Sequence, residues 1–85
     1  MLLADARKDV EERVKNIIIE ELRVDRTKLT DDASFAVDLG ADSLDLIEMV
    51  MSLEKEFDID IPDSIAEELH TVGQTVKYLQ ERMEK

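Results

Sequence analysis

Residues 40–57 read GADSLDLIEMVMSLEKEF and carry the most informative pattern of the chain. Apolar residues recur there at helical spacing, which is typical of an amphipathic α-helix. Asp42 is a good N-cap for this helix, and the acidic Asp45 suits its first turn. The sequence therefore predicts a helix over residues 43–57, with Ser43 at its start.

This helix is predicted to have two apolar faces. At about 100° per residue, one face points toward a core and consists of Leu46, Met49, Val50, Leu53 and Phe57. The other face, here called the apolar strip, consists of Leu44, Ile47 and Met51 and is bordered by Asp45, Glu48, Glu54 and Lys55. Since a bundle helix needs only one buried stripe, the apolar strip indicates either a docking surface or a helix packed on two sides.

The rest of the chain predicts three further helices. Residues 5–22 carry one apolar stripe, which Leu3 and Ala6 continue toward the N-terminus, whereas Ile19 falls on the opposite, exposed face. Residues 23–42 have no period and predict a long loop that is pinned to the core by Leu29, Phe35 and Leu39. Capping-box spacings at 64–67 and 71–74 predict a short helix over residues 64–69 and a last helix over 72–83. We expect an all-α four-helix bundle with a long first loop and a short third helix, in one domain over residues 1–85.

The composition excludes several classes of function. The chain has 22 acidic and 11 basic residues and a formal net charge of −11, which disfavours nucleic acid and anionic membranes and favours partners with basic patches. It has no Cys and a single His, so disulfides, thiolate sites and most His-based catalysis are excluded. No apolar run approaches the roughly 18 residues of a membrane span, and the N-terminus lacks the pattern of a signal peptide. We expect a soluble, cytoplasmic monomer that does not insert into membranes and has no catalytic residues.

Two familiar motifs are incomplete here. Residues 58–63 begin like a calcium loop, but the sixth position is Asp63 rather than Gly and the twelfth is Leu69 rather than Glu. We therefore expect no specific metal site, only weak binding of divalent cations to clustered carboxylates. Ser43 stands one place too late for the G-x-S-x-G nucleophile elbow, and His70 is the sole candidate base.

Ser43 is an ordinary residue for a helix start, but its position is informative. It directly follows the long loop, is the first residue of the helix with two apolar faces and lies beside the apolar strip. A hydroxyl there is well placed for modification by another enzyme. The helix N-terminus would stabilise an attached phosphate by about 0.3–1 kcal/mol at an exposed site.

Residues 38–45, DLGADSLD, resemble the phosphopantetheine attachment motif of acyl carrier proteins, whose Asp-Ser-Leu core corresponds to residues 42–44. The resemblance extends from about residue 11 to 79, through ASF at 33–35, EKEF at 54–57 and IPD at 61–63, and is greatest to the type II fatty-acid carriers of bacteria and organelles. Lys55 and Ile65 depart from it, because many relatives have acids at these positions, and several extra residues precede the usual start.

The resemblance implies a covalent cofactor and a carrier function rather than an enzyme. A carrier-protein synthase would transfer 4′-phosphopantetheine from coenzyme A to Ser43, which makes the chain a phosphoprotein. The thiol of this arm would hold the growing fatty acyl chain as a thioester and present it to fatty-acid synthesis enzymes with basic patches. The residues matching the partner surface are Asp42, Leu44, Asp45, Ile47, Glu48, Met51 and Glu54. The candidates for lining an acyl pocket are Leu46, Val50, Ile61, Ala66 and Leu69.

Two alternatives stay open at the level of sequence. A carrier for polyketide, peptidyl or lipid A-type acyl transfer would use the same serine. A small calcium-responsive or adaptor bundle would need no modification of Ser43. The strongly acidic second helix and the free-standing length favour the fatty-acid carrier.

Overall fold

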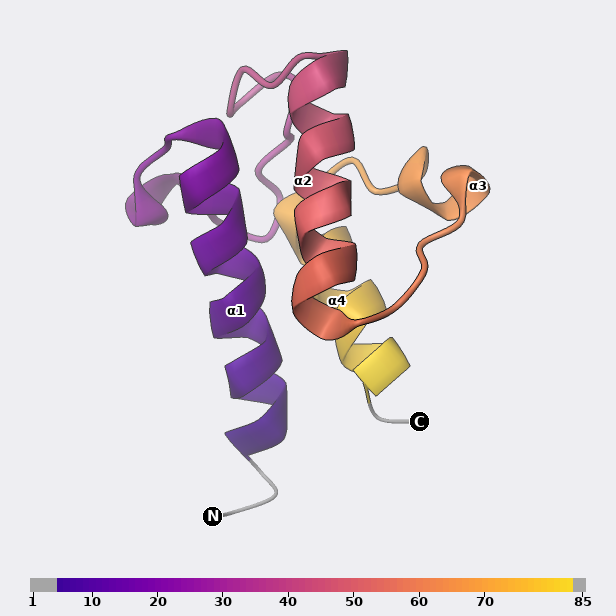
Figure 1. The fold of residues 1–85 in the computed structure, drawn as a ribbon. Helices are drawn as coiled ribbons and strands as arrows, with labels where there is room; N and C mark the ends of the chain where they lie inside the picture. The colour runs from indigo at the N-terminus through magenta and orange to yellow at the C-terminus, as the bar shows by residue number, and fades with distance from the viewer. Residues whose placement is uncertain (1–4, 84–85) are drawn as a thin grey trace.

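A computed structural model describes residues 5–83 of the chain, with side chains from residue 8 onward (Figure 1). Within this range the chain forms four α-helices and one short 3₁₀ helix: α1 (Asp5–Leu22), η1 (Arg26–Lys28), α2 (Ser43–Phe57), α3 (Asp63–Ala66) and α4 (Val72–Met83). Helix α1 packs against both α2 and α4, and α3 stands to one side of this group (Figure 1). The all-α bundle with a long first loop and a short third helix is confirmed.

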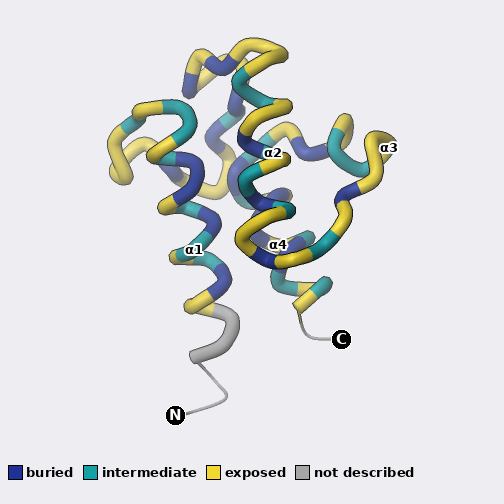
Figure 2. Tube along the Cα trace, viewed as in Figure 1, coloured by how far each residue is buried: buried dark blue, intermediate teal, exposed yellow. Residues whose placement is uncertain are grey.

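The core is formed where the apolar stripes of α1, α2 and α4 meet. Met49, Leu53 and Phe57 of α2 are buried, as their positions on the helix predicted (Figure 2). The prediction that Ile19 is exposed was wrong, because this side chain is half-buried and packs against the core. Helix α1 contacts two helices and therefore buries a wider arc than one stripe. The expected contributions of Leu3 and Ala6 lie outside the described side chains.

The long loop over residues 23–42 is fixed to the core and to the start of α4. Leu29, Phe35 and Leu39 are buried, as expected. The Phe35 N–H donates to the carbonyl of His70 (3.0 Å), and the Val72 N–H donates to the carbonyl of Ala33 (3.1 Å). An isolated antiparallel bridge between Ser34 and Thr71 lies between these bonds. The loop therefore presents the start of α2 from a firmly held position.

Capping boxes start two of the helices. At α2, the Asp45 N–H donates to Oδ1 of Asp42 (2.9 Å) and the Asp42 N–H donates to Oδ2 of Asp45 (3.1 Å). At α4, Thr71 and Gln74 make the corresponding pair of bonds, at 3.1 and 3.0 Å, as their spacing predicted. These bonds satisfy amide groups that a helix start leaves unpaired.

Helix α3 corrects the expected range of 64–69, because it spans only Asp63–Ala66. Its N-cap is Pro62, whose carbonyl accepts the N–H groups of Ile65 and Ala66, and there is no side-chain cap. The Leu69 N–H donates to the carbonyl of Ala66, three residues back, so the chain continues as a turn rather than an α-helix. The expected cap at Ser64 is therefore not formed.

Candidate functional site

Ser43 is the first residue of α2 and is exposed to solvent. The capping box occupies the N–H groups of Asp42 and Asp45, whereas those of Ser43 and Leu44 have no hydrogen-bond partner among residues 5–83. Amides at a helix start are a suitable binding site for a phosphate group. An accessible hydroxyl thus lies next to two available donors.

No base accompanies this hydroxyl in the described part of the chain. Ser43 makes no side-chain hydrogen bond there, and His70 is exposed and bonds only through its backbone. A catalytic serine needs a base within hydrogen-bond reach and a group that orients this base. The arrangement suits a serine that is modified by another protein.

The apolar strip lies on the surface. Leu44, Ile47 and Met51 are 61%, 56% and 60% exposed, so the alternative of a helix packed on two sides was wrong. Asp42 and Glu48 beside the strip are exposed, whereas Asp45 and Glu54 are half-buried. Exposed segments recur along α2 in Figure 2. The structure thus presents an apolar surface with acidic residues at its border.

Ser43 also lines a cavity of about 510 Å³ between α2 and residues 61–67. Four of the five candidates for an acyl pocket, Leu46, Val50, Ile61 and Ala66, line the same cavity. Leu69 is buried but is not among the lining residues, because the chain turns away from the cavity after the short α3. The structure therefore brings an exposed serine and an apolar cavity wall together.

Glu54 lines this cavity as well and has a partner that sequence reasoning missed. Its Oε2 accepts a hydrogen bond from the backbone N–H of Ile61 (2.8 Å). Its own carbonyl accepts the N–H groups of Ile59 and Asp58. No local pattern could have predicted the side-chain bond, because it depends on how the segment after α2 folds back.

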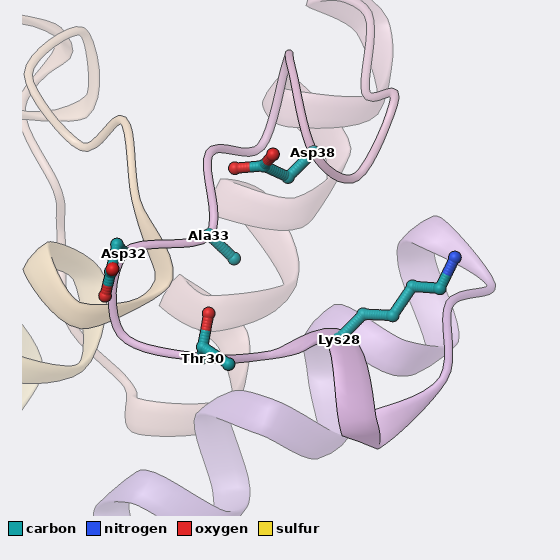
Figure 3. Close-up of a pocket in the computed structure, with 5 residues that line it drawn as sticks. All are labelled: Lys28, Thr30, Asp32, Ala33 and Asp38. Atoms are coloured by element: carbon teal, nitrogen blue, oxygen red, sulfur yellow. The ribbon is translucent and has the colours of Figure 1, made fainter.

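A second cavity, of about 310 Å³, lies along the long loop (Figure 3). Its lining residues are Lys28, Thr30, Asp32, Ala33 and Asp38. The side chain of Lys28 extends away from Asp32, and the Asp38 carboxylate already accepts the N–H of Ser34 (2.7 Å). Because these polar groups do not converge, the cavity does not form a binding site of recognisable chemistry.

Residues 5–83 contain neither a recognisable metal site nor a helix that could span a membrane. No group of three or more His, Cys, Asp or Glu side chains is placed there to hold a metal ion. None of the helices in that range has the length and apolar character that a membrane span requires.

Comparison with known proteins defines the class. Residues 12–79 match the family model described as "Phosphopantetheine attachment site", which identifies a protein that bears covalent 4′-phosphopantetheine. An acyl carrier protein of Phenylobacterium zucineum (strain HLK1) is 59% identical over 75 residues, which are 88% of this chain and 95% of the relative. One of Caulobacter vibrioides (strain NA1000 / CB15N) is 55% identical over 74 residues, which are 87% of this chain and 95% of the relative. The chain belongs to the acyl carrier protein family.

Membership of this family confirms the carrier function, the covalent cofactor and the absence of an enzymatic role that the sequence predicted. The partners are acyl chains and enzymes of fatty-acid synthesis. The cofactor supplies the thiol on which an acyl group is held as a thioester, and this chain has no Cys of its own.

Proposed function

We propose that Ser43 is the residue that bears 4′-phosphopantetheine, and that the cavity beside it shelters the acyl chain. The observation that carries this proposal is the position of Ser43, which is exposed at a helix start and lines the same cavity as Leu46, Val50 and Ile61. The hydroxyl oxygen provides the covalent link to the phosphate. The amides of Ser43 and Leu44 are placed to donate to the phosphate oxygens.

The apolar strip and its acidic border form the proposed docking surface for fatty-acid synthesis enzymes. Leu44, Ile47 and Met51 supply apolar contact area, and Met side chains adapt to partners of different shape. Asp42, Asp45 and Glu48 supply negative charge that attracts a basic patch and sets its orientation. A cytoplasmic location is part of this proposal, since the enzymes of carrier-based synthesis meet the carrier in solution.

The intact mass of the protein tests the attachment residue. After incubation with coenzyme A and a carrier-protein synthase, we expect the mass to increase by one phosphopantetheine group. The increase is expected to vanish in Ser43→Ala and to persist in Ser64→Ala, which removes another exposed serine on the far side of the cavity. A mass increase that survives Ser43→Ala would refute the assignment.

A further inference from the structure

The outer wall of the Ser43 cavity is a short irregular segment. This wall consists of the segment after α2, in which Ile61 is buried in the core, and of the four-residue α3, whose Ile65 and Ala66 pack against the core without being fully buried. Figure 1 shows α3 standing apart from the other helices at the end of this segment. Besides this packing, the segment is held by single hydrogen bonds, one of which runs from Nη1 of Arg82 on α4 to the carbonyl of Asp60 (3.1 Å).

One bond at this position comes from a side chain of the opposite wall. Glu54 is half-buried on α2, and its Oε2 lies 2.8 Å from the Ile61 nitrogen. Ile61 itself is only 4% exposed, so its N–H would be without a partner if the carboxylate were removed. A bond to a charged acceptor that replaces water at a buried amide is among the stronger single hydrogen bonds.

The other acidic residues of α2 differ in this respect. The Glu48 side chain is exposed, and no hydrogen bond or ion pair joins it to another residue that the structure describes. The Asp45 carboxylate is engaged in the capping box, at the opposite end of the helix. Glu54 is thus the acid that connects the two walls of the cavity, and Glu48 is its natural control.

We propose that Glu54 is a positioning residue that holds the two walls of the cavity together along a long acyl chain through its bond to the Ile61 N–H. This inference rests on the proposed attachment at Ser43 and on the proposed role of the cavity. It assigns to Glu54 a task beyond the contribution of one more negative charge to the docking surface. Loss of the bond loosens the attachment of residues 61–66 to α2, although Ile61 still packs in the core, so that water and small nucleophiles reach the thioester of a long chain more readily.

Amide hydrogen exchange in the protein without cofactor tests the bond alone. We expect the Ile61 amide to exchange at least about tenfold faster in Glu54→Ala than in the native chain, because a bond to a charged acceptor is lost. Glu54→Gln is expected to restore most of the protection, since its amide oxygen also accepts a hydrogen bond, and Glu48→Ala should change nothing. Equal exchange in Glu54→Ala and the native chain would overturn the proposal.

Thioester reactivity then tests the consequence for the acyl chain. Octanoyl and acetyl forms of the protein are treated with hydroxylamine. The hydroxylamine nitrogen forms a bond to the thioester carbonyl carbon as the C–S bond breaks, and the phosphopantetheine sulfur leaves as a free thiol. We expect octanoyl cleavage to be slower than acetyl cleavage in the native chain. In Glu54→Ala, octanoyl cleavage should become about tenfold faster, in line with the lost bond, while acetyl cleavage stays unchanged.

Controls separate this inference from the proposed function. Loading is measured first by intact mass, so that failure to load refutes attachment at Ser43 and not the role of Glu54. Glu54→Gln and Glu48→Ala should retain the native ratio of octanoyl to acetyl cleavage, and Glu54→Asp replaces Glu54→Ala if the latter does not fold. An unchanged ratio in Glu54→Ala or Glu54→Asp, or the same change in Glu48→Ala, would overturn the positioning role.

Discussion

Gly73 is the residue at which α4 approaches the long loop most closely. A Cβ atom at this position would lie 2.8 Å from the carbonyl oxygen of Asp31, which also accepts the Gly73 N–H (2.9 Å). In an exposed helix, Gly→Ala stabilises by about 1 kcal/mol. Here we expect Gly73→Ala to lower the free energy of unfolding by about 1–3 kcal/mol, because backbone must move.

Urea denaturation of Gly73→Ala measures the change in the free energy of unfolding, and a decrease would support the prediction. Lys77→Ala on the same helix is the control, since Lys77 is exposed and a change there is expected to stay within about 0.5 kcal/mol. A more stable Gly73→Ala protein would show that the close approach is not maintained.

Single residues could be assigned from the sequence where helical spacing decides their environment. Met49 and Leu53 are buried, as their angular positions predicted, whereas the angular position of Ile47 left open whether it is exposed, as the structure shows it to be. Thr75 could not be assigned in this way, because it is fully buried despite its hydroxyl. Its Oγ1 donates to the carbonyl of Thr71 (3.0 Å), so that burial leaves no unpaired polar group.

At the scale of elements, Arg13 connects α1 to the end of α2. Its Nε donates to the Glu56 carboxylate (2.8 Å), its Nη2 donates to the Glu56 carbonyl (2.9 Å), and its guanidinium lies 4.3 Å from the ring centroid of Phe57. A cation near the last carbonyls of a helix is favourable. A planar guanidinium makes these contacts together, whereas an ammonium group cannot.

We therefore expect Arg13→Lys to destabilise the fold by about 1 kcal/mol, although the charge is kept. Thermal and urea unfolding measure the loss. Lys15→Ala is the matched control, because its pair with Glu11 lies within α1 and should contribute only about 0.3–0.5 kcal/mol. If both variants lose the same stability, the connection to α2 is not the cause.

The exposed side of α2 leads to a prediction about salt. We expect Glu48→Lys to raise the KM for loading by a carrier-protein synthase more strongly at low than at high ionic strength, because salt screens attraction between exposed charges. Glu81→Lys on α4 makes the same change of net charge away from the strip and should have a smaller effect. A loss that is independent of salt would argue against electrostatic docking.

Long elements were predictable and short ones were not. Helices α1, α2 and α4 coincide with the expected ranges, since each repeats its apolar spacing over several turns. The three-residue η1 is too short to show a period, and α3 begins after Pro62 without the side-chain cap that its sequence predicted. The bonds between the loop and α4 depend on the folded chain as a whole. The same holds for the bond from Glu54 to Ile61.

The whole molecule has a net charge of −11, so repulsion between carboxylates opposes folding at low ionic strength. We expect millimolar MgCl₂ to raise the Tm measured by circular dichroism. NaCl should also raise the Tm, at about 0.1 M, where the screening length falls to about 10 Å. The effect should not require a divalent ion, because no group of acids within residues 5–83 is placed to bind a metal ion. A Tm that neither salt changes would show that repulsion is unimportant.

The long loop is irregular, but hydrogen bonds within it and to the residues just before α4 hold it rigidly. The amides of Phe35 and Ala41 donate to backbone carbonyls at 3.0 and 2.8 Å, and both residues are buried. Partial melting should therefore begin around α3, while the turn that precedes Ser43 keeps its shape. A phosphopantetheine arm on Ser43 would then keep a fixed attachment point even when the cavity wall around the acyl chain has unfolded.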